Sequence, residues 1–172
     1  MEKGYVHLYT GNGKGKTTAA FGLAVRAAMA GKKVYIGQFV KDMVYNETKI
    51  QETVPNIEVE QLGEGCFIEK PPTESDRKAA RLALVKCGEL MRSGAYQMVI
   101  LDEITIALYF KLLTVEEVVK VLKGRNPEVE IVLTGRYAPQ ELIDIADLVT
   151  EMKEIKHYYA TEGVLSRDGI DR

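Results

Sequence analysis

Residues 10–18 read TGNGKGKTT, between the apolar run 5–10 and a helical pattern that continues up to Gly31. The glycines of this stretch allow successive backbone N–H groups to turn inward as an anion nest, and the start of the helix adds partial positive charge. Lys16 is placed to reach phosphate oxygens, and the Thr17 hydroxyl is placed to bind a magnesium ion. The stretch therefore predicts a phosphate-binding P-loop formed by Gly11, Asn12, Gly13, Lys14, Gly15, Lys16, Thr17 and Thr18.

One position departs from the consensus G-x-x-x-x-G-K-[ST]. Its first glycine falls on Thr10, so either this position accepts threonine or the loop is one residue shorter, counted from Gly11. A dinucleotide-binding fingerprint fits less well, because it needs a small residue where Lys16 stands and an acid where Gln38 stands. A plain glycine-rich turn is the other alternative, and the setting between a strand and a helix argues against it.

Short apolar runs alternate with longer amphipathic ones, which is the pattern of parallel strands joined by helices on both faces of a sheet. We expect strands at 5–10, 33–39, 57–62, 98–101, 130–134 and 148–152, and helices at 16–30, 73–93, 114–124 and 141–145. Because 172 residues are about one domain's worth of chain, the prediction is a single three-layer α/β domain over residues 1–172, with a mostly parallel sheet and a P-loop NTPase-like (RecA-like) fold.

Composition excludes several classes of protein. With 46% apolar and 28% charged residues the chain can bury an ordinary core, which argues against disorder. The net charge of -2 supplies no field for nucleic acid, and no apolar run approaches a membrane span, so neither partner is expected. Two cysteines, Cys66 and Cys87, cannot form a disulfide framework, which together with the absence of a signal sequence predicts a cytoplasmic protein.

The apolar stretch 98–101 leads into two carboxylates, Asp102 and Glu103. Beside a P-loop, such carboxylates at the end of a buried strand are typical metal ligands, and Glu103 is also a candidate base. The alternative is that either residue caps a helix that starts at Ile104. Together with Thr17, the pair predicts a divalent metal site.

Ligands of open parallel sheets bind outside the carboxyl ends of the strands, so the residues that follow each strand are candidates. Gln38, Phe39 and Lys41 follow the second strand, and Arg136 follows the fifth. Arg136 is a candidate phosphate ligand, with an ordinary surface cation as the alternative. His157 is as well explained by a surface or packing role as by a ligand contact. The long stretch 41–74 holds at most one strand, so it is either a functional loop or a surface excursion.

These motifs, taken together, resemble the P-loop ATP:corrinoid adenosyltransferases of the CobA/CobO/BtuR type. The similarity runs in order along nearly the whole chain, through residues 11–22, 38–41, 101–103, 134–136, 156–157 and 169–171. The resemblance implies transfer of the adenosyl group of ATP to the cobalt of a reduced corrinoid, with triphosphate as the leaving group. It further implies Mg²⁺ or Mn²⁺, a homodimer, and an ATP that lies in reversed sense in the P-loop. An electron donor such as a flavoprotein reductase is a further partner that it suggests.

In this interpretation Lys16, Asp102 and Glu103 are the catalytic residues. The corrinoid side is expected to be formed by the stretch 41–74 and by Gln38, Phe39, Lys41, Phe67 and His157. Where enterobacterial members carry Gly-Phe-Thr-Trp, this chain has Gly65-Cys66-Phe67-Ile68, so Phe67 or Cys66 is the candidate for displacing the lower cobalt ligand. Two other functions share the same loop: a kinase or ATPase acting at the γ-phosphate, and a regulator that binds ATP without reaction.

Overall fold

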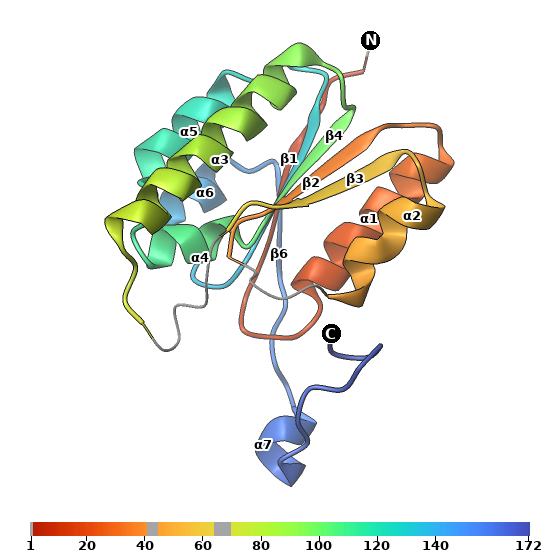
Figure 1. Cartoon of the computed structure of the whole chain (residues 1–172), viewed down its shortest axis with the longest axis vertical. Coiled ribbons are helices and arrows are strands. Elements are labelled where there is room, and N and C mark those ends of the chain that lie inside the picture. Colours follow the sequence, from red (N-terminus) through yellow and green to blue (C-terminus); the bar gives the residue numbers. More distant parts are fainter. Residues whose placement is uncertain (1, 41–44, 64–69) are drawn as a thin grey trace.

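The computed structural model describes residues 2–40, 45–63 and 70–172. Strands and helices alternate along the chain (Figure 1). The strands are β1 (Val6–Thr10), β2 (Val34–Gln38), β3 (Ile57–Gln61), β4 (Met98–Asp102), β5 (Glu130–Thr134) and β6 (Leu148–Glu151). The helices are α1 (Lys16–Met29), α2 (Ile50–Thr53), α3 (Glu74–Ser93), α4 (Ile104–Tyr109), α5 (Val115–Lys123), α6 (Gln140–Ile145) and α7 (Tyr158–Glu162), with a 3-10 helix η1 (Asn46–Lys49).

The strands form one parallel sheet in the order β3-β2-β4-β5-β1-β6. Figure 1 shows α1 and α2 on one face of this sheet and α3, α4, α5 and α6 on the other. Because all strands run in the same direction, their carboxyl ends lie at the same end of the sheet, and contacts of Asp102 join the ends of β2, β4 and β5 to the start of α1. The predicted three-layer α/β fold is confirmed.

The core lies on both faces of the sheet, as the apolar strands predict. In β4, Val99 and Leu101 pack with the α3 side, whereas Met98 and Ile100 pack with the α1 side. All four side chains are at most 4% exposed. Continuous apolar sequence is therefore required in this strand, because successive side chains enter different cores.

The helix ends follow the signals in the sequence. The hydroxyl oxygens of Thr73 and Thr114 each accept a hydrogen bond from the backbone N–H of the third helical residue. The backbone N–H of each threonine in turn donates to the carboxylate of that residue, so α3 and α5 begin with capping boxes. Gly31, just beyond α1, has the left-handed φ of +81° that favours glycine there.

The described part of the stretch 41–74 contains one strand, β3, together with η1 and α2, which the sequence pattern did not predict. Residues 41–44 and 64–69 lie outside the described residues, and so do the predictions made for Lys41, Cys66 and Phe67. Helices α4 and α7 are also additional. Among the helices described, none is long and apolar enough to cross a lipid bilayer.

Candidate active site

The loop after β1 leads directly into α1 at the carboxyl edge of the sheet. Gly11 and Gly15 have φ angles of +96° and +119°, which only glycine adopts without strain. Lys16, the first residue of α1, is 7% exposed, and its Nζ donates to the carbonyl oxygen of Gly13 at 2.7 Å. Burial lowers the pKa of Lys16 because it disfavours the ammonium, and the charge of Arg136 lowers it further. An anion held here would stabilise the charged form.

The loop rests against the backbone that follows β6. The N–H of Gly13 donates to the carbonyl oxygen of Met152 at 2.6 Å, and the N–H of Met152 donates to the carbonyl oxygen of Thr10 at 2.8 Å. A Cβ at position 13 would stand 2.7 Å from the Met152 oxygen, closer than such atoms approach. The close approach of two backbones therefore requires glycine at position 13.

Asp102 is fully buried and accepts three hydrogen bonds from side chains. Its Oδ1 accepts from the hydroxyls of Thr17 at 2.8 Å and Thr134 at 2.7 Å, and its Oδ2 accepts from Nε2 of Gln38 at 3.0 Å. The register of the sheet explains the third contact, because Gln38 of β2 lies opposite Asp102 of β4. The carboxylate thus joins the start of α1 to the ends of three strands.

Glu103 lies at the N-cap position of α4 with a left-handed φ of 61°. Its N–H donates to the hydroxyl of Thr134 at 2.9 Å, but no side chain accepts a capping bond from the first turn of α4. The carboxylate of Asp102 likewise bonds to Thr17, Thr134 and Gln38. Glu103 thus stands at the cap position that the alternative requires, but its side chain makes no capping hydrogen bond there.

The oxygen atoms where the P-loop meets the end of β4 are suitable ligands for a hard divalent cation. The hydroxyl oxygen of Thr17 lies 2.8 Å from Oδ1 of Asp102 at the end of the P-loop. Oxygen is the ligand atom that Mg²⁺ prefers. No cluster of three or more His, Cys, Asp or Glu residues that could hold a metal ion occurs in the described parts of the chain. A cation held by one or two protein oxygens, with phosphate and water completing its shell, is the usual arrangement for Mg²⁺. The residues present fit such an ion.

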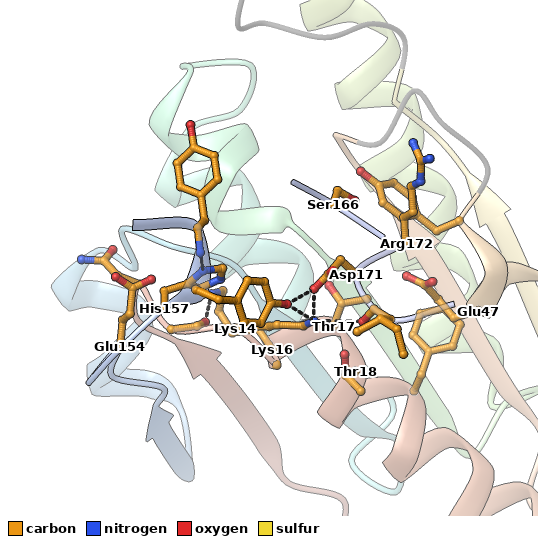
Figure 2. A pocket seen from close by; sticks show the side chains of 18 of the residues that line it. Lys14, Lys16, Thr17, Thr18, Glu47, Glu154, His157, Ser166, Asp171 and Arg172 are labelled. Atoms are coloured by element: carbon orange, nitrogen blue, oxygen red, sulfur yellow. Dashed lines mark hydrogen bonds and ion pairs between the residues drawn. The ribbon is translucent and has the colours of Figure 1, made fainter. Parts of the chain in front are cut away.

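A cavity of about 640 Å³ opens above the P-loop (Figure 2). Residues 12–18 form its floor, and Glu103, Arg136 and His157 lie on its wall. The remaining lining residues are Phe21, Tyr45, Asn46, Glu47, Glu154, Tyr158, Tyr159, Val164, Ser166, Gly169, Ile170, Asp171 and Arg172. Its size is in the range typical of small-molecule sites.

The structure separates the residues predicted for the corrinoid side. His157 borders the cavity. Gln38 is fully buried in its contact with Asp102, and Phe39 is 1% exposed within the core on the α3 side. Contacts of these three residues with a corrinoid stay predictions.

Other residues of the site carried no signal that sequence reasoning used. Met152 contributes only its backbone, which leaves no mark in the sequence. Tyr45, Asn46 and Glu47 come to the cavity through η1, in a stretch without helical or strand periodicity. Asp171 belongs to one of the motifs noted above, but its contacts could be found only in three dimensions.

Comparison with known proteins gives consistent results. Residues 2–171 match the family model described as "ATP:corrinoid adenosyltransferase BtuR/CobO/CobP". The chain is 35% identical over 170 residues to the corrinoid adenosyltransferase of Escherichia coli K12, covering 99% of this chain and 86% of that protein. It is 40% identical over 174 residues to the corrinoid adenosyltransferase of a Sinorhizobium species, covering 99% and 81% of the two chains. Among solved structures, the RadB recombinase is similar in fold, with a TM-score of 0.57 and 17% identity over 99% of this chain and 84% of that one.

Proposed function

We propose, because the chain belongs to the ATP:corrinoid adenosyltransferase family and is therefore a transferase, that it moves the 5′-deoxyadenosyl group of ATP to the cobalt(I) of a reduced corrinoid. Triphosphate is the leaving group. The product is an adenosylated corrinoid, made during the synthesis or salvage of adenosylcobalamin. Residues 1–172 act as one domain in this proposal.

The reaction needs no nucleophile from the protein. Cobalt(I) supplies the electron pair of the new cobalt–carbon bond, the bond between C5′ and its oxygen breaks, and that electron pair leaves with the triphosphate. The chain then has two tasks: to hold cobalt and C5′ within reach of each other, and to stabilise the charge that develops on the leaving oxygen.

The second task falls to the floor of the cavity. Lys16 and the P-loop N–H groups other than that of Gly13, which donates to Met152, bind the phosphates, and Arg136 lines the same cavity. Thr17, Asp102 and Glu103 would hold Mg²⁺ or Mn²⁺, which when bound neutralises charge on phosphate oxygens. The hydrogen bonds from Thr17 and Thr134 keep the Asp102 carboxylate in place before ATP arrives.

The first task needs a broad cover beside the phosphates. We assign it to the stretch 41–74, with Lys41 and Phe67 in contact with the corrinoid and His157 at the rim of the cavity. In this assignment Gln38 and Phe39 support the site without touching the corrinoid, because both are buried at the end of β2. Gln38 orients Asp102 through its hydrogen bond, and Phe39 packs in the core on the α3 side.

The observation that carries the proposal is the meeting of Lys16, Thr17 and Asp102 under one cavity. A buried ammonium and a hydroxyl from the start of α1, with a buried carboxylate from the end of β4, form the phosphate and metal end of an ATP site. Membership of the family supports C5′ of ATP, rather than its γ-phosphate, as the atom that is attacked.

Incubation with ATP, Mg²⁺ and a chemically reduced corrinoid tests the proposal. The visible spectrum should change to that of an alkylated corrinoid, with triphosphate formed in equal amount. Lys16→Met should lower the rate by about 10²- to 10³-fold, the scale for removing a donor to a developing anion. Lys123→Met, an exposed lysine of α5, should not change it. Formation of ADP would indicate a kinase or ATPase instead, and unchanged ATP would indicate a regulator.

Two further parts of the proposal concern partners. If the protein is a homodimer, sedimentation should give twice the mass of one chain. A measured mass of one chain would exclude the homodimer. A flavoprotein electron donor predicts that such a reductase replaces the chemical reductant in the same assay.

A further inference from the structure

The chain turns back after α7 and crosses the cavity. Gly163, with a φ of +67°, ends α7, and the following residues return toward the start of α1 (Figure 1). Six residues between 164 and 172 line the cavity. We name residues 163–172 the return segment. It covers the same space into which the P-loop opens.

The return segment is held on one side by Lys14. The ammonium of Lys14 donates to the hydroxyl of Tyr158 at 3.3 Å, to the carbonyl oxygen of Ile170 at 2.9 Å and to Oδ1 of Asp171. An ammonium has three N–H donors, and these three acceptors lie in α7 and in the return segment. Lys14 thus belongs to the P-loop by sequence but serves as an anchor for another segment, and Lys16 is the lysine that faces the phosphate nest.

Asp171 is the centre of this contact. Its Oδ1 also accepts from the hydroxyl of Tyr158, and its Oδ2 accepts from the backbone N–H of Arg167 at 3.0 Å and from Nε of Arg167 at 3.2 Å. These donors hold the pKa of the carboxyl well below its usual range, the bond from Lys14 being the largest cause. The guanidinium of Arg167 in turn lies 4.8 Å from the ring centre of Tyr158. The carboxylate therefore fixes both the return segment and Lys14.

A second anchor lies across the cavity. Nδ2 of Asn46, at the start of η1, donates to Oδ1 of Asp168 at 2.8 Å and to the carbonyl oxygen of Arg172 at 2.9 Å. Figure 2 shows Asp171 beside Lys14, and Arg172 on the side of Glu47. The return segment thus spans from the P-loop to η1, and it lines the same cavity as the P-loop.

We propose that the return segment forms the outer wall of the nucleotide site and that Asp171, acting through Lys14, is the positioning residue that keeps this wall closed over a bound nucleoside triphosphate. The proposal rests on the ATP site proposed above. Its consequence is kinetic: the nucleotide leaves only after the contact between Lys14 and Asp171 has opened. The wall therefore slows dissociation more than it changes the chemical step.

The test is the dissociation rate of a fluorescent ATP analogue labelled on the ribose, chased with excess ATP in a stopped-flow instrument. Asp171→Asn and Lys14→Met should each raise this rate by roughly threefold to tenfold, the range for losing one partly exposed charged hydrogen bond. The double variant should be faster than the wild type by less than the product of the two single effects, because both changes break the contact between Lys14 and Asp171, although each also breaks bonds of its own. Glu162→Gln, which removes an exposed negative charge in α7, is the matched control and should dissociate like the wild type.

The outcomes separate this proposal from the one on which it rests. One outcome is that the wild type binds the analogue while both single variants release it at the wild-type rate. That result would refute the closing role of the return segment but would leave the proposed ATP site intact. Additive effects in the double variant also contradict it. If Asp171→Asn binds the analogue more tightly, Asp171 competes with phosphate for Lys14 and the proposed role is overturned. If the wild type binds no adenosine nucleotide, the ATP site itself is refuted.

Discussion

Replacing Gly13 by alanine should abolish tight ATP binding without unfolding the protein. The added Cβ would stand 2.7 Å from the oxygen and 2.8 Å from the carbonyl carbon of Met152. Both are backbone atoms at the end of β6, so neither can rotate away as a side chain does. The loop must move, and it must give up the 2.6 Å hydrogen bond from the N–H of Gly13 to Met152.

The cost can be worked out from these contacts. Overpacking of this kind costs about 1–3 kcal/mol, and a lost hydrogen bond about 1 kcal/mol. In the absence of ATP the loop can shift and so avoid most of this strain. The free energy of unfolding should therefore fall by less than the sum of the overpacking and hydrogen-bond energies. Binding requires the original loop, because Lys16 is held by the carbonyl oxygen of Gly13 at 2.7 Å. The dissociation constant should therefore rise by about 30-fold to 1,000-fold, the equivalent of about 2–4 kcal/mol.

Isothermal titration calorimetry with Mg²⁺ and ATP, together with urea unfolding, measures both quantities. Gly22→Ala is the matched control in the adjoining helix, because a Cβ there meets nothing within 4 Å. This control should bind ATP normally and unfold at a free energy higher by about 0.5–1 kcal/mol, since alanine favours a helix interior over glycine. Unchanged ATP affinity in Gly13→Ala would refute the reasoning, because the contact with Met152 would then not shape the site.

Three other predictions concern stability and reactivity. Thr73→Ala removes the capping box that Thr73 forms with Asp76 and should lower the free energy of unfolding in urea by about 1 kcal/mol; an unchanged midpoint would contradict this role. Thr134→Val keeps the shape of a fully buried side chain but leaves an oxygen of Asp102 without its 2.7 Å partner, so unfolding should become easier by about 1–3 kcal/mol, and wild-type stability would count against the network. Burial raises the pKa of Cys87 to about 12, so at pH 8 almost none of this thiol is the reactive thiolate; iodoacetamide should label Cys87 only after unfolding, as mass spectrometry of its peptide can measure, and rapid labelling of the native protein would disprove the burial.

The sequence predicted those parts of the fold that depend on local patterns. Strands follow apolar runs, and Thr73 and Thr114 begin helices because capping needs only residues three positions apart. The phosphate loop was predictable for the same reason, since its glycines and Lys16 are neighbours in the chain. The contact of Thr17 with Asp102 was expected from two motifs that commonly occur together, and the structure brings these side chains to 2.8 Å; their role with a metal ion stays a prediction.

The remaining features depend on contacts between distant parts of the chain. The strand order cannot be read from periodicity, because every strand is compatible with several neighbours in a parallel sheet. Helix α7 has only five residues and no buried side chain, so it shows no amphipathic pattern. The contacts of Asp171 with Lys14 and of Asn46 with Asp168 join positions more than 100 residues apart, and no spacing rule reaches that far.

Strand β6 has consequences for how the molecule loses its activity on heating. It lies at the edge of the sheet, pairs with β1, and exposes all four of its residues. The chain from Met152 onward, including the backbone that supports Gly13, continues from this strand and is otherwise held by the contacts of Lys14 and Asn46 with the return segment. Such an element is a local unfolding unit of low stability, whose amide protons exchange before those of the central strands. Catalysis should therefore be lost at a lower temperature than the one at which the sheet melts, and bound ATP should bring the two temperatures together.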